Sequence, residues 1–479
     1  MIALLRRQPR PFSIIFMLEI WERFGFYTVQ GILVLYFVRS VGFSHQHAYT
    51  TFGTFCALIY GMVPLGGYLG DKLLGTKRAI VVGLLVLMTG YALLALQDDH
   101  LLYLSLAFIC VGAALFKSNP GVLLAQCYPR GSDTIQSGFT LYYMAINIGA
   151  LASLLIGPYV SSHYGYAYAY WIAALGMLLG LLNYVVQYPV IASIKTVSDH
   201  RRLSSAWWII LLGGIALFIG LSTYLLAHPG IARKIILIIT GGFVLVYFWC
   251  MHQATKKERL RLLLAFVLMI EAVVFFTLYH QMPTSINVFA VNHVYPTLLG
   301  VHLDPQSFQV LNPFWIIVLS PVLAWWYTSL NRRKLSFAIP YKFVVGMVCC
   351  SISFMILYLT RFFADEQTMV SSWWLVASYL FQALGELLVS ALGVAMVAEL
   401  VSPKIMGFVM GVWFLTSSVA GFTGAAVASL TALPKGMLPG VDSLSVYTHV
   451  FLQIGIVTFA AAVAMAVLAP WLMRWIKIK

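Results

Sequence analysis

The chain has 479 residues, of which 61% are hydrophobic and 9% are charged, and its formal net charge is +14. Soluble domains carry charges on roughly 25% of their residues, so this composition excludes an ordinary soluble protein and indicates a membrane protein. Apolar runs of about 20 residues, long enough to cross a bilayer, follow one another along nearly the whole chain. We attribute the positive net charge to cytoplasmic loops and not to binding of nucleic acid.

Fourteen membrane-spanning helices are predicted. In chain order, they cover residues 12–39, 48–71, 78–97, 101–127, 134–160, 168–189, 206–227, 231–252, 260–290, 308–330, 342–363, 370–400, 405–431 and 444–474. With the N-terminus in the cytoplasm, the cytoplasmic segments hold 22 of the 29 Lys and Arg residues, the outer loops hold five, and two lie within spans. Basic residues concentrate in the cytoplasmic loops of membrane proteins. This bias predicts an even number of spans with both termini in the cytoplasm.

The predicted spans form two blocks of six around a middle pair, which we expect to be a lipid-facing hairpin. We assign residues 1–190 to an N-terminal six-helix bundle, 191–258 to a linker and a two-helix hairpin, and 259–479 to a C-terminal six-helix bundle. This is the plan of a major facilitator transporter, whose substrate site lies near the bilayer midplane between the halves. The expected fold is therefore an all-α polytopic membrane protein of the plasma membrane, which is the inner membrane in a Gram-negative bacterium.

A loop motif lies between the second and third predicted spans. The sequence "GGYLGDKLLGTKR", residues 66–78, resembles the major facilitator loop signature of glycines, an acid and basic residues. Glycines allow helices to pack closely. Asp71 is placed to pair with Arg78, which predicts a latch for one conformation of the protein. A solvated turn without this function is the alternative.

The first predicted span contains three charged residues, Glu19, Glu22 and Arg23, in the sequence "LEIWERFGFYTVQG". At 3.6 residues per turn, they share one face of the helix with Tyr27 and Gln30. Glu19 and Arg23 are four residues apart and are predicted to pair along the helix. Adjacent residues on a helix do not face each other, so Glu22 is predicted to need a partner other than Arg23.

Three further charged residues lie well inside predicted spans: Lys117, Glu271 and Glu386. A charge in hydrocarbon costs at least about 2.5–3.5 kcal/mol, so each is expected to face a cavity or a partner. Lys117 is the predicted partner of Glu22, because a buried lysine exchanges acidic partners readily. Glu271 is isolated among apolar residues and is expected to carry a proton or to act as a gate with a distant base. A purely structural ion pair is the alternative for any one of these residues.

The distribution of these charges suggests a class of ligand. Cations in the first half of the chain and Glu386 in the second half suit a molecule with a carboxylate at one end and an amine at the other. Acids beside the cations offer a route for protons, so the residues predict a proton-driven carrier of a zwitterion. The same fold with another cargo, such as a drug, nitrate or a modified amino acid, is one alternative, and a non-transporting sensor is another. No HExxH motif and no convincing Ser/His or paired-Asp arrangement occurs at membrane depth, and the cysteines form no CxxC pair, so neither an enzyme nor a metal site is predicted.

The motifs that carry these charges resemble those of the proton-dependent oligopeptide transporter (POT/PTR) family of the major facilitator superfamily. "EIWERFGFY" resembles the family signature E-x-x-E-R-F-x-Y-Y, and "LYYMAINIGAL" resembles the signature F-Y-x-x-I-N-x-G-S-L. "YHQMPTSINVFAVNHV" and "YLFQALGELLVSALGVAMVAEL" are similar to segments of the bacterial dipeptide and tripeptide permeases. The resemblance runs nearly end to end. It implies proton-coupled symport of dipeptides and tripeptides into the cytoplasm by alternating access, in a monomer with no cofactor besides the coupling protons.

The resemblance also implies roles for individual residues. The residues that would exchange protons and switch ion-pair partners are Glu19, Glu22, Arg23, Lys117 and Glu271. The residues that would bind substrate are Arg23 and Lys117 at the peptide carboxylate, Glu386 at its amino terminus, Tyr27, Tyr60, Asn147 and Asn312 along its backbone, and Trp413 and Ser417 on the amino-terminal side. This chain departs from the family pattern at Phe26, which replaces the first tyrosine of a signature pair, at Gln30, where some relatives have a second arginine, and at Ala150. The preferred peptide length and side chains therefore stay open.

Overall fold

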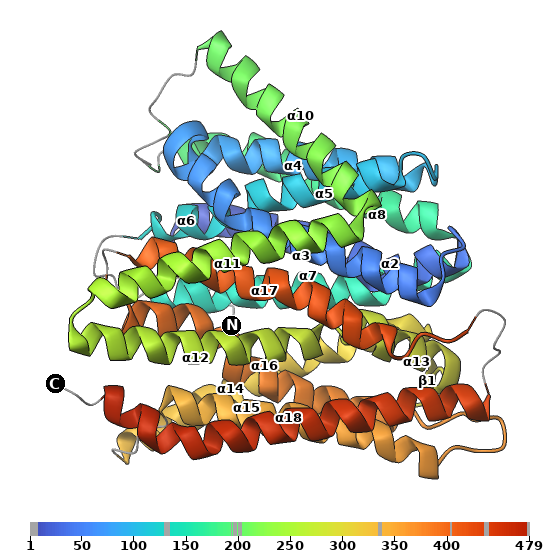
Figure 1. Cartoon of the computed structure of the whole chain (residues 1–479). Coiled ribbons are helices and arrows are strands. Elements are labelled where there is room, and N and C mark those ends of the chain that lie inside the picture. Colours follow the sequence, from blue (N-terminus) through green and yellow to red (C-terminus); the bar gives the residue numbers. More distant parts are fainter. Residues whose placement is uncertain are drawn as a thin grey trace. The chain divides into compact units, whose positions relative to one another are not determined.

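The computed structural model describes residues 8–128, 135–192, 194, 199, 204–333, 338–402, 405–434 and 440–476, nearly all of them helical (Figure 1). The helices of the first half are α2 Arg10–Arg39, α3 His45–Tyr68, the π-helix η1 Leu69–Leu74, α4 Thr76–Ala95, α5 Leu102–Lys117, α6 Asn119–Ala125, α7 Ile135–His163, α8 Tyr166–Val186, α9 Tyr188–Ala192 and α10 Ser205–Ala227. The elements of the second half are α11 Pro229–Gln253, α12 Lys256–Tyr279, η2 Met282–Ile286, α13 Asn287–His293, β1 Thr297–Leu298, β2 Val301–His302, η3 Pro305–Val310, α14 Leu311–Arg332, α15 Ile339–Leu359, η4 Thr360–Phe362, α16 Trp373–Leu400, α17 Met406–Ser429 and α18 Val441–Ile476.

Twelve helical segments of the described chain are long and apolar enough to cross a membrane. Two further helices, α2 with 30 residues and α16 with 28 residues, also exceed the length of about 20 residues that a span requires. These segments are compatible with the fourteen predicted spans. The count of fourteen and the cytoplasmic position of both termini stay predictions.

The predicted spans match the observed helices to within a few residues at most ends, but some spans contain interruptions. The fourth span breaks at Ser118, where α5 ends and α6 begins with a proline in its first turn. The prediction of one helix over 260–290 is wrong in detail, because α12 ends at Tyr279 and a π-helical turn around Pro283 precedes α13. Proline lacks the backbone N–H that a regular helix requires and clashes with the preceding turn, so the α-helix stops there.

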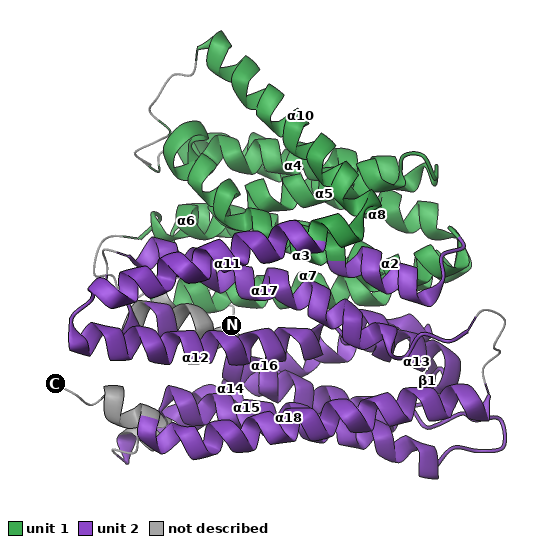
Figure 2. Cartoon of the chain, viewed as in Figure 1, with its two compact units in different colours: residues 1–41, 54–232 green, residues 42–53, 233–479 purple. Residues whose placement is uncertain are grey.

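The chain divides into two compact units (Figure 2). The first unit contains residues 1–41 and 54–232, and the second contains residues 42–53 and 233–479. The division therefore passes through α3 and near the start of α11. The predicted bundles at 1–190 and 259–479, with their connecting hairpin at 191–258, stay a prediction.

In the first unit, α2 packs against α7 and α8, and α5 packs against α4 and α10. The approach of α7 to α2 requires a glycine, because a Cβ at Gly149 would lie 2.5 Å from the Ile20 carbonyl oxygen and 2.8 Å from the Arg23 Cβ. On α8, a Cβ at Gly176 would lie 3.1 Å from the Phe24 ring. Small residues let helix backbones approach closely, so α7 is held against the charged face of α2.

In the second unit, α12 packs against α16 and α17, α14 packs against α16, and α15 packs against α16 and α18. α12 begins with a capping box, in which the Thr255 hydroxyl accepts a hydrogen bond from the Glu258 N–H and the Glu258 carboxylate accepts one from the Thr255 N–H. A capping box satisfies amide groups that the first helical turn leaves unpaired. The helix that carries Glu271 therefore has a defined start.

Candidate functional site

A buried acid–base cluster on α2 forms the centre of the candidate site. Arg23 Nε lies 2.9 Å from Glu19 Oε1 and 2.7 Å from Glu22 Oε2. Glu19, Glu22 and Arg23 are 1%, 0% and 7% exposed. With both carboxylates ionised, the three residues have an excess of one negative charge. Because an unbalanced charge is expensive away from water, the cluster needs one proton or one further cation.

The prediction that Glu22 cannot pair with Arg23 is wrong. Neighbouring Cβ atoms on a helix diverge by about 100°, but both side chains are long enough to turn toward each other, as the 2.7 Å contact shows. The contact is an ion pair without a hydrogen bond, because both buried Glu22 carboxylate oxygens lack a hydrogen-bond partner. The predicted pairing of Glu19 with Arg23 is confirmed, and here Arg23 Nε donates a hydrogen bond. Glu22 thus keeps acceptor capacity for a proton.

Tyr142 on α7 belongs to the cluster, although it is not among the predicted site residues. Its hydroxyl donates a hydrogen bond to Glu19 Oε2 at 2.6 Å. The sequence signal was the tyrosine pair in "LYYMAINIGAL". Which of two adjacent tyrosines faces α2 depends on how α7 packs, and the close contact at Gly149 sets that packing.

Lys117, the last residue of α5, lies over aromatic rings. Its Nζ is 4.2 Å from the centroid of the Phe26 ring and 5.2 Å from that of the Tyr60 ring. Within the residues that the structure describes, Lys117 forms no ion pair shorter than 4.0 Å. Instead of the predicted pair with Glu22, the structure has cation–π contacts, which stabilise an ammonium ion over the electron-rich face of a ring. Lys117 still interacts electrostatically with both Glu22 and Arg23.

Two of the other predicted substrate residues of the first unit, Tyr27 and Tyr60, lie near this cluster. Tyr60 interacts electrostatically with Tyr27 and Arg23. Asn147 is buried on α7, and its Nδ2 donates a hydrogen bond to the Tyr143 carbonyl oxygen at 2.9 Å. Polar groups of α2, α3 and α7 are therefore gathered around Arg23.

In the second unit, Glu386 of α16 and Asn312 of α14 are in contact. Asn312 Nδ2 donates a hydrogen bond to Glu386 Oε2 at 2.9 Å. Trp413 and Ser417 lie on successive turns of α17, and both are buried. The Trp413 ring packs edge-on against Phe276 of α12, with 6.1 Å between the centroids. The predicted amino-terminal subsite thus contains an acid that an amide already orients.

Two buried polar side chains of the second unit have no hydrogen-bond partner among the described residues. Glu271 is 8% exposed, and neither of its carboxylate oxygens is hydrogen bonded. Gln382, one turn before Glu386 on α16, is 5% exposed, and neither atom of its side-chain amide is satisfied. The predicted isolation of Glu271 is confirmed.

The two residues of the predicted latch lie at the start of α4 and in the π-helix before it. Asp71 is an exposed residue of η1. The Arg78 guanidinium donates hydrogen bonds to the carbonyl oxygens of Leu74 at 3.3 Å and Asp199 at 3.4 Å. These contacts tie the start of α4 to the segment that precedes α10. A latch between Asp71 and Arg78 stays a prediction.

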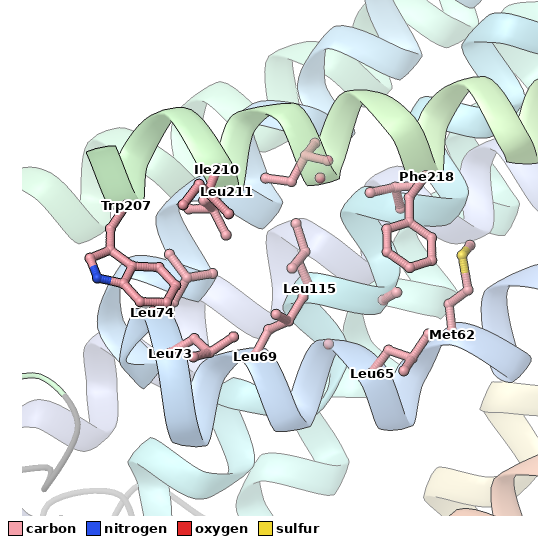
Figure 3. A pocket seen from close by; sticks show the side chains of 15 residues that line it. Met62, Leu65, Leu69, Leu73, Leu74, Leu115, Trp207, Ile210, Leu211 and Phe218 are labelled. Carbon is pink, nitrogen blue, oxygen red and sulfur yellow. The ribbon is translucent and has the colours of Figure 1, made fainter. Parts of the chain in front are cut away.

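An apolar cavity of about 230 Å³ lies in the first unit beside α10 (Figure 3). Side chains of α3, η1, α5 and α10 line it, among them Met62, Leu69, Leu115, Trp207 and Phe218. None of its lining residues is charged. A zwitterion would lose its hydration here without gaining ionic partners, so this cavity does not fit the predicted ligand.

Comparisons with known proteins show which family this chain resembles. The family model described as "POT family" matches residues 77–444. The chain is 45% identical over 473 residues to the dipeptide and tripeptide permease B of Photorhabdus asymbiotica, covering 98% of this chain and 97% of the relative. It is 44% identical over 474 residues to the dipeptide and tripeptide permease B of Salmonella typhimurium, covering 98% and 97% of the two chains.

Solved structures of similar proteins extend the likeness to three dimensions. The chain matches a bacterial homologue of the human drug peptide transporters PepT1 and PepT2 with a TM-score of 0.86 and 32% identity, over 97% of this chain and 99% of that one. It matches tetrameric PepTSo2 with a TM-score of 0.87 and 32% identity, over 97% and 99% of the chains. A peptide transporter POT in complex with sulfate matches with a TM-score of 0.85 and 27% identity, over 98% and 96% of the chains.

Proposed function

Since the chain belongs to the POT family of multi-pass membrane transporters, we propose that it carries dipeptides and tripeptides into the cytoplasm together with protons, by alternating access. It is a transporter and not an enzyme. The observation that carries the proposal is the buried cluster in which Arg23 contacts both Glu19 and Glu22. Such a cluster holds one negative charge too many when both acids are ionised, so protonation of one acid frees Arg23 for an incoming anion, and proton uptake and anion binding favour each other.

The peptide carboxylate binds the cations of the first unit, Arg23 and Lys117. Approach of a carboxylate to Arg23 gives the guanidinium a new partner and weakens its hold on Glu22. A carboxyl that loses its cation in a buried site favours the protonated form. Substrate binding at Arg23 and protonation of Glu22 are therefore coupled, and the unsatisfied oxygens of Glu22 are available for the proton.

The peptide amino terminus binds Glu386, which Asn312 orients through its hydrogen bond. Tyr27, Tyr60 and Asn147 contact the peptide backbone. Trp413 and Ser417 line the site on the side of the peptide amino terminus. Contacts to the two termini and the backbone are shared by all short peptides, so side chains are selected only weakly. Glu271 accepts a second proton, because a buried carboxyl without a cation is costly to ionise.

Purified protein in proteoliposomes with an imposed inward proton gradient tests this function. The expected result is accumulation of labelled dialanine above its outside concentration, which collapses when an ionophore dissipates the gradient. In Glu22→Gln, gradient-driven accumulation is lost while exchange of labelled for unlabelled peptide continues. Unchanged proton-driven uptake in Glu22→Gln contradicts the coupling role.

Another small zwitterion or a drug-like molecule is the alternative cargo, and competition separates it from peptides. Unlabelled dipeptides and tripeptides are expected to suppress uptake of labelled dialanine, whereas failure of any dipeptide to compete would refute peptide transport. We further propose that the plasma-membrane protein works as a monomer, since each chain carries all the residues invoked above. Light scattering of the protein–detergent complex checks this, and a stable tetramer like that described for PepTSo2 contradicts it.

A further inference from the structure

Phe26 stands where the family signature has a tyrosine, and the structure gives its ring a contact of its own. The Lys117 Nζ lies 4.2 Å from the centroid of the Phe26 ring, closer than to the Tyr60 ring at 5.2 Å. Phe26 is 2% exposed, so its contact with the ammonium group is shielded from water. Cation–π contacts are stronger when they are desolvated.

An aromatic ring holds a cation differently from a carboxylate. It attracts the ammonium group without neutralising its charge, and it occupies only the side of the group that faces the ring. The N–H bonds on the other side remain available to an anion. Arg23 also lies near this ring, with its guanidinium carbon 5.8 Å from the centroid, but it is already engaged by Glu19 and Glu22.

We propose that Phe26 is a positioning residue that holds the charged Lys117 ammonium, which forms no ion pair shorter than 4.0 Å among the described residues, ready for the peptide carboxylate. Phe26 thereby sets how strongly the protein discriminates a free peptide carboxylate from an uncharged C-terminus. This proposal rests on the proposed peptide transport. The proposed role of Phe26 can be distinguished from simple packing, because packing does not depend on the electron density of the ring.

Replacing Phe26 with mono-, di- and trifluorophenylalanine tests the proposal with little change of shape. Each fluorine withdraws electron density from the ring face and weakens its attraction for a cation. The readout is the ratio of inhibition constants of dialanine amide and dialanine in competition with labelled dialanine. We expect this ratio to fall stepwise with the number of fluorine atoms, by about tenfold over the series, through weaker binding of the free acid alone.

Two controls separate charge positioning from packing. Phe24 lies on the same helix, is also buried, and packs against Trp21 and not against a cation, so its fluorination should leave the ratio unchanged. In Lys117→Gln, which has no ammonium group, fluorination of Phe26 should change the ratio far less, because the Arg23 guanidinium lies farther from the ring centroid, at 5.8 Å.

Three outcomes overturn the inference: a flat series at Phe26, equal losses for the acid and the amide, or the same trend at Phe24. Failure of the unsubstituted protein to bind dialanine would overturn the proposed function itself. A flat series in a protein that binds dialanine normally would overturn only the role of Phe26.

Discussion

Gly66 of α3 is the position where one added methyl group should separate two helices of the site. A Cβ at Gly66 would lie 1.8 Å from the Ala114 carbonyl oxygen and 2.4 Å from its carbonyl carbon on α5. Ordinary contacts of a Cβ begin near 3.4 Å, so Gly66→Ala requires a local separation of about 1.6 Å, the difference between 3.4 and 1.8 Å. Both obstructing atoms belong to the backbone, so no side-chain rotation can relieve the clash.

The separation should lower both stability and transport. Overpacking of a close-packed core costs typically about 1–3 kcal/mol, and the 1.8 Å contact places this substitution at the upper end of that range. For a chain of 479 residues, with an unfolding entropy of about 2.1 cal/mol/K per residue, a loss of about 3 kcal/mol corresponds to a fall in Tm of roughly 3 °C. Moving α3 from α5 also lengthens the 5.2 Å contact between Tyr60 and Lys117, so the affinity for dialanine should fall as well.

Thermal unfolding of the purified protein in detergent, followed by scanning fluorimetry, measures the effect. Gly213→Ala on α10 is the matched control, because nothing lies within 4 Å of a Cβ at that position and alanine favours a helix by about 0.5–1 kcal/mol over glycine. The control should therefore keep or raise Tm. A Tm for Gly66→Ala within about 1 °C of the control would refute the argument that α3 and α5 are in backbone contact there.

Three further substitutions test individual residues of the site. Glu386→Gln keeps an oxygen for the Asn312 amide but removes the charge. Free dipeptides should therefore bind about 10- to 100-fold more weakly, while N-acetylated dipeptides should lose little affinity. Equal losses of affinity for both would contradict contact with the amino terminus. Tyr142→Phe removes the hydroxyl that donates a hydrogen bond to Glu19. Because hydrogen bonds to charged groups contribute about 1.5–3 kcal/mol, this substitution should reduce both Tm and gradient-driven uptake. Wild-type values of both would show that the hydrogen bond is unimportant. Glu271→Gln should keep Tm at or above that of the wild type, because the carboxylate has no hydrogen-bond partner to lose, and should abolish accumulation against a gradient; retained accumulation would exclude Glu271 from coupling.

Much of the fold follows from the sequence because the bilayer imposes simple rules on it. A span requires about 20 apolar residues with every backbone amide bonded inside the helix, so long apolar runs predict helices whatever their partners are. The charged residues of α2 share one face because the 3.6-residue period is local. The break after Lys117 could likewise be predicted from the Asn119-Pro120 pair, which acts within one turn.

Features that depend on contacts between distant segments required the tertiary structure. The sequence alone did not select Tyr142 over Tyr143, because the choice depends on how α7 rotates against α2 at Gly149. The sequence alone also predicted, wrongly, that Glu22 does not pair with Arg23. Helix geometry fixes the directions of the Cβ atoms but not the positions of the ends of long side chains.

Lys117 shows this division most clearly. Its position inside a span makes it a candidate functional residue from the sequence alone, since a buried charge must have a favourable environment. What that environment is depends on which rings α2 and α3 bring to the end of α5, and those are Phe26 and Tyr60. The sequence by itself thus determined the spans, the buried charges and the family, because these depend on local pattern. Only packing between helices decided the partners of each charge, because a partner is defined by distance in space and not along the chain.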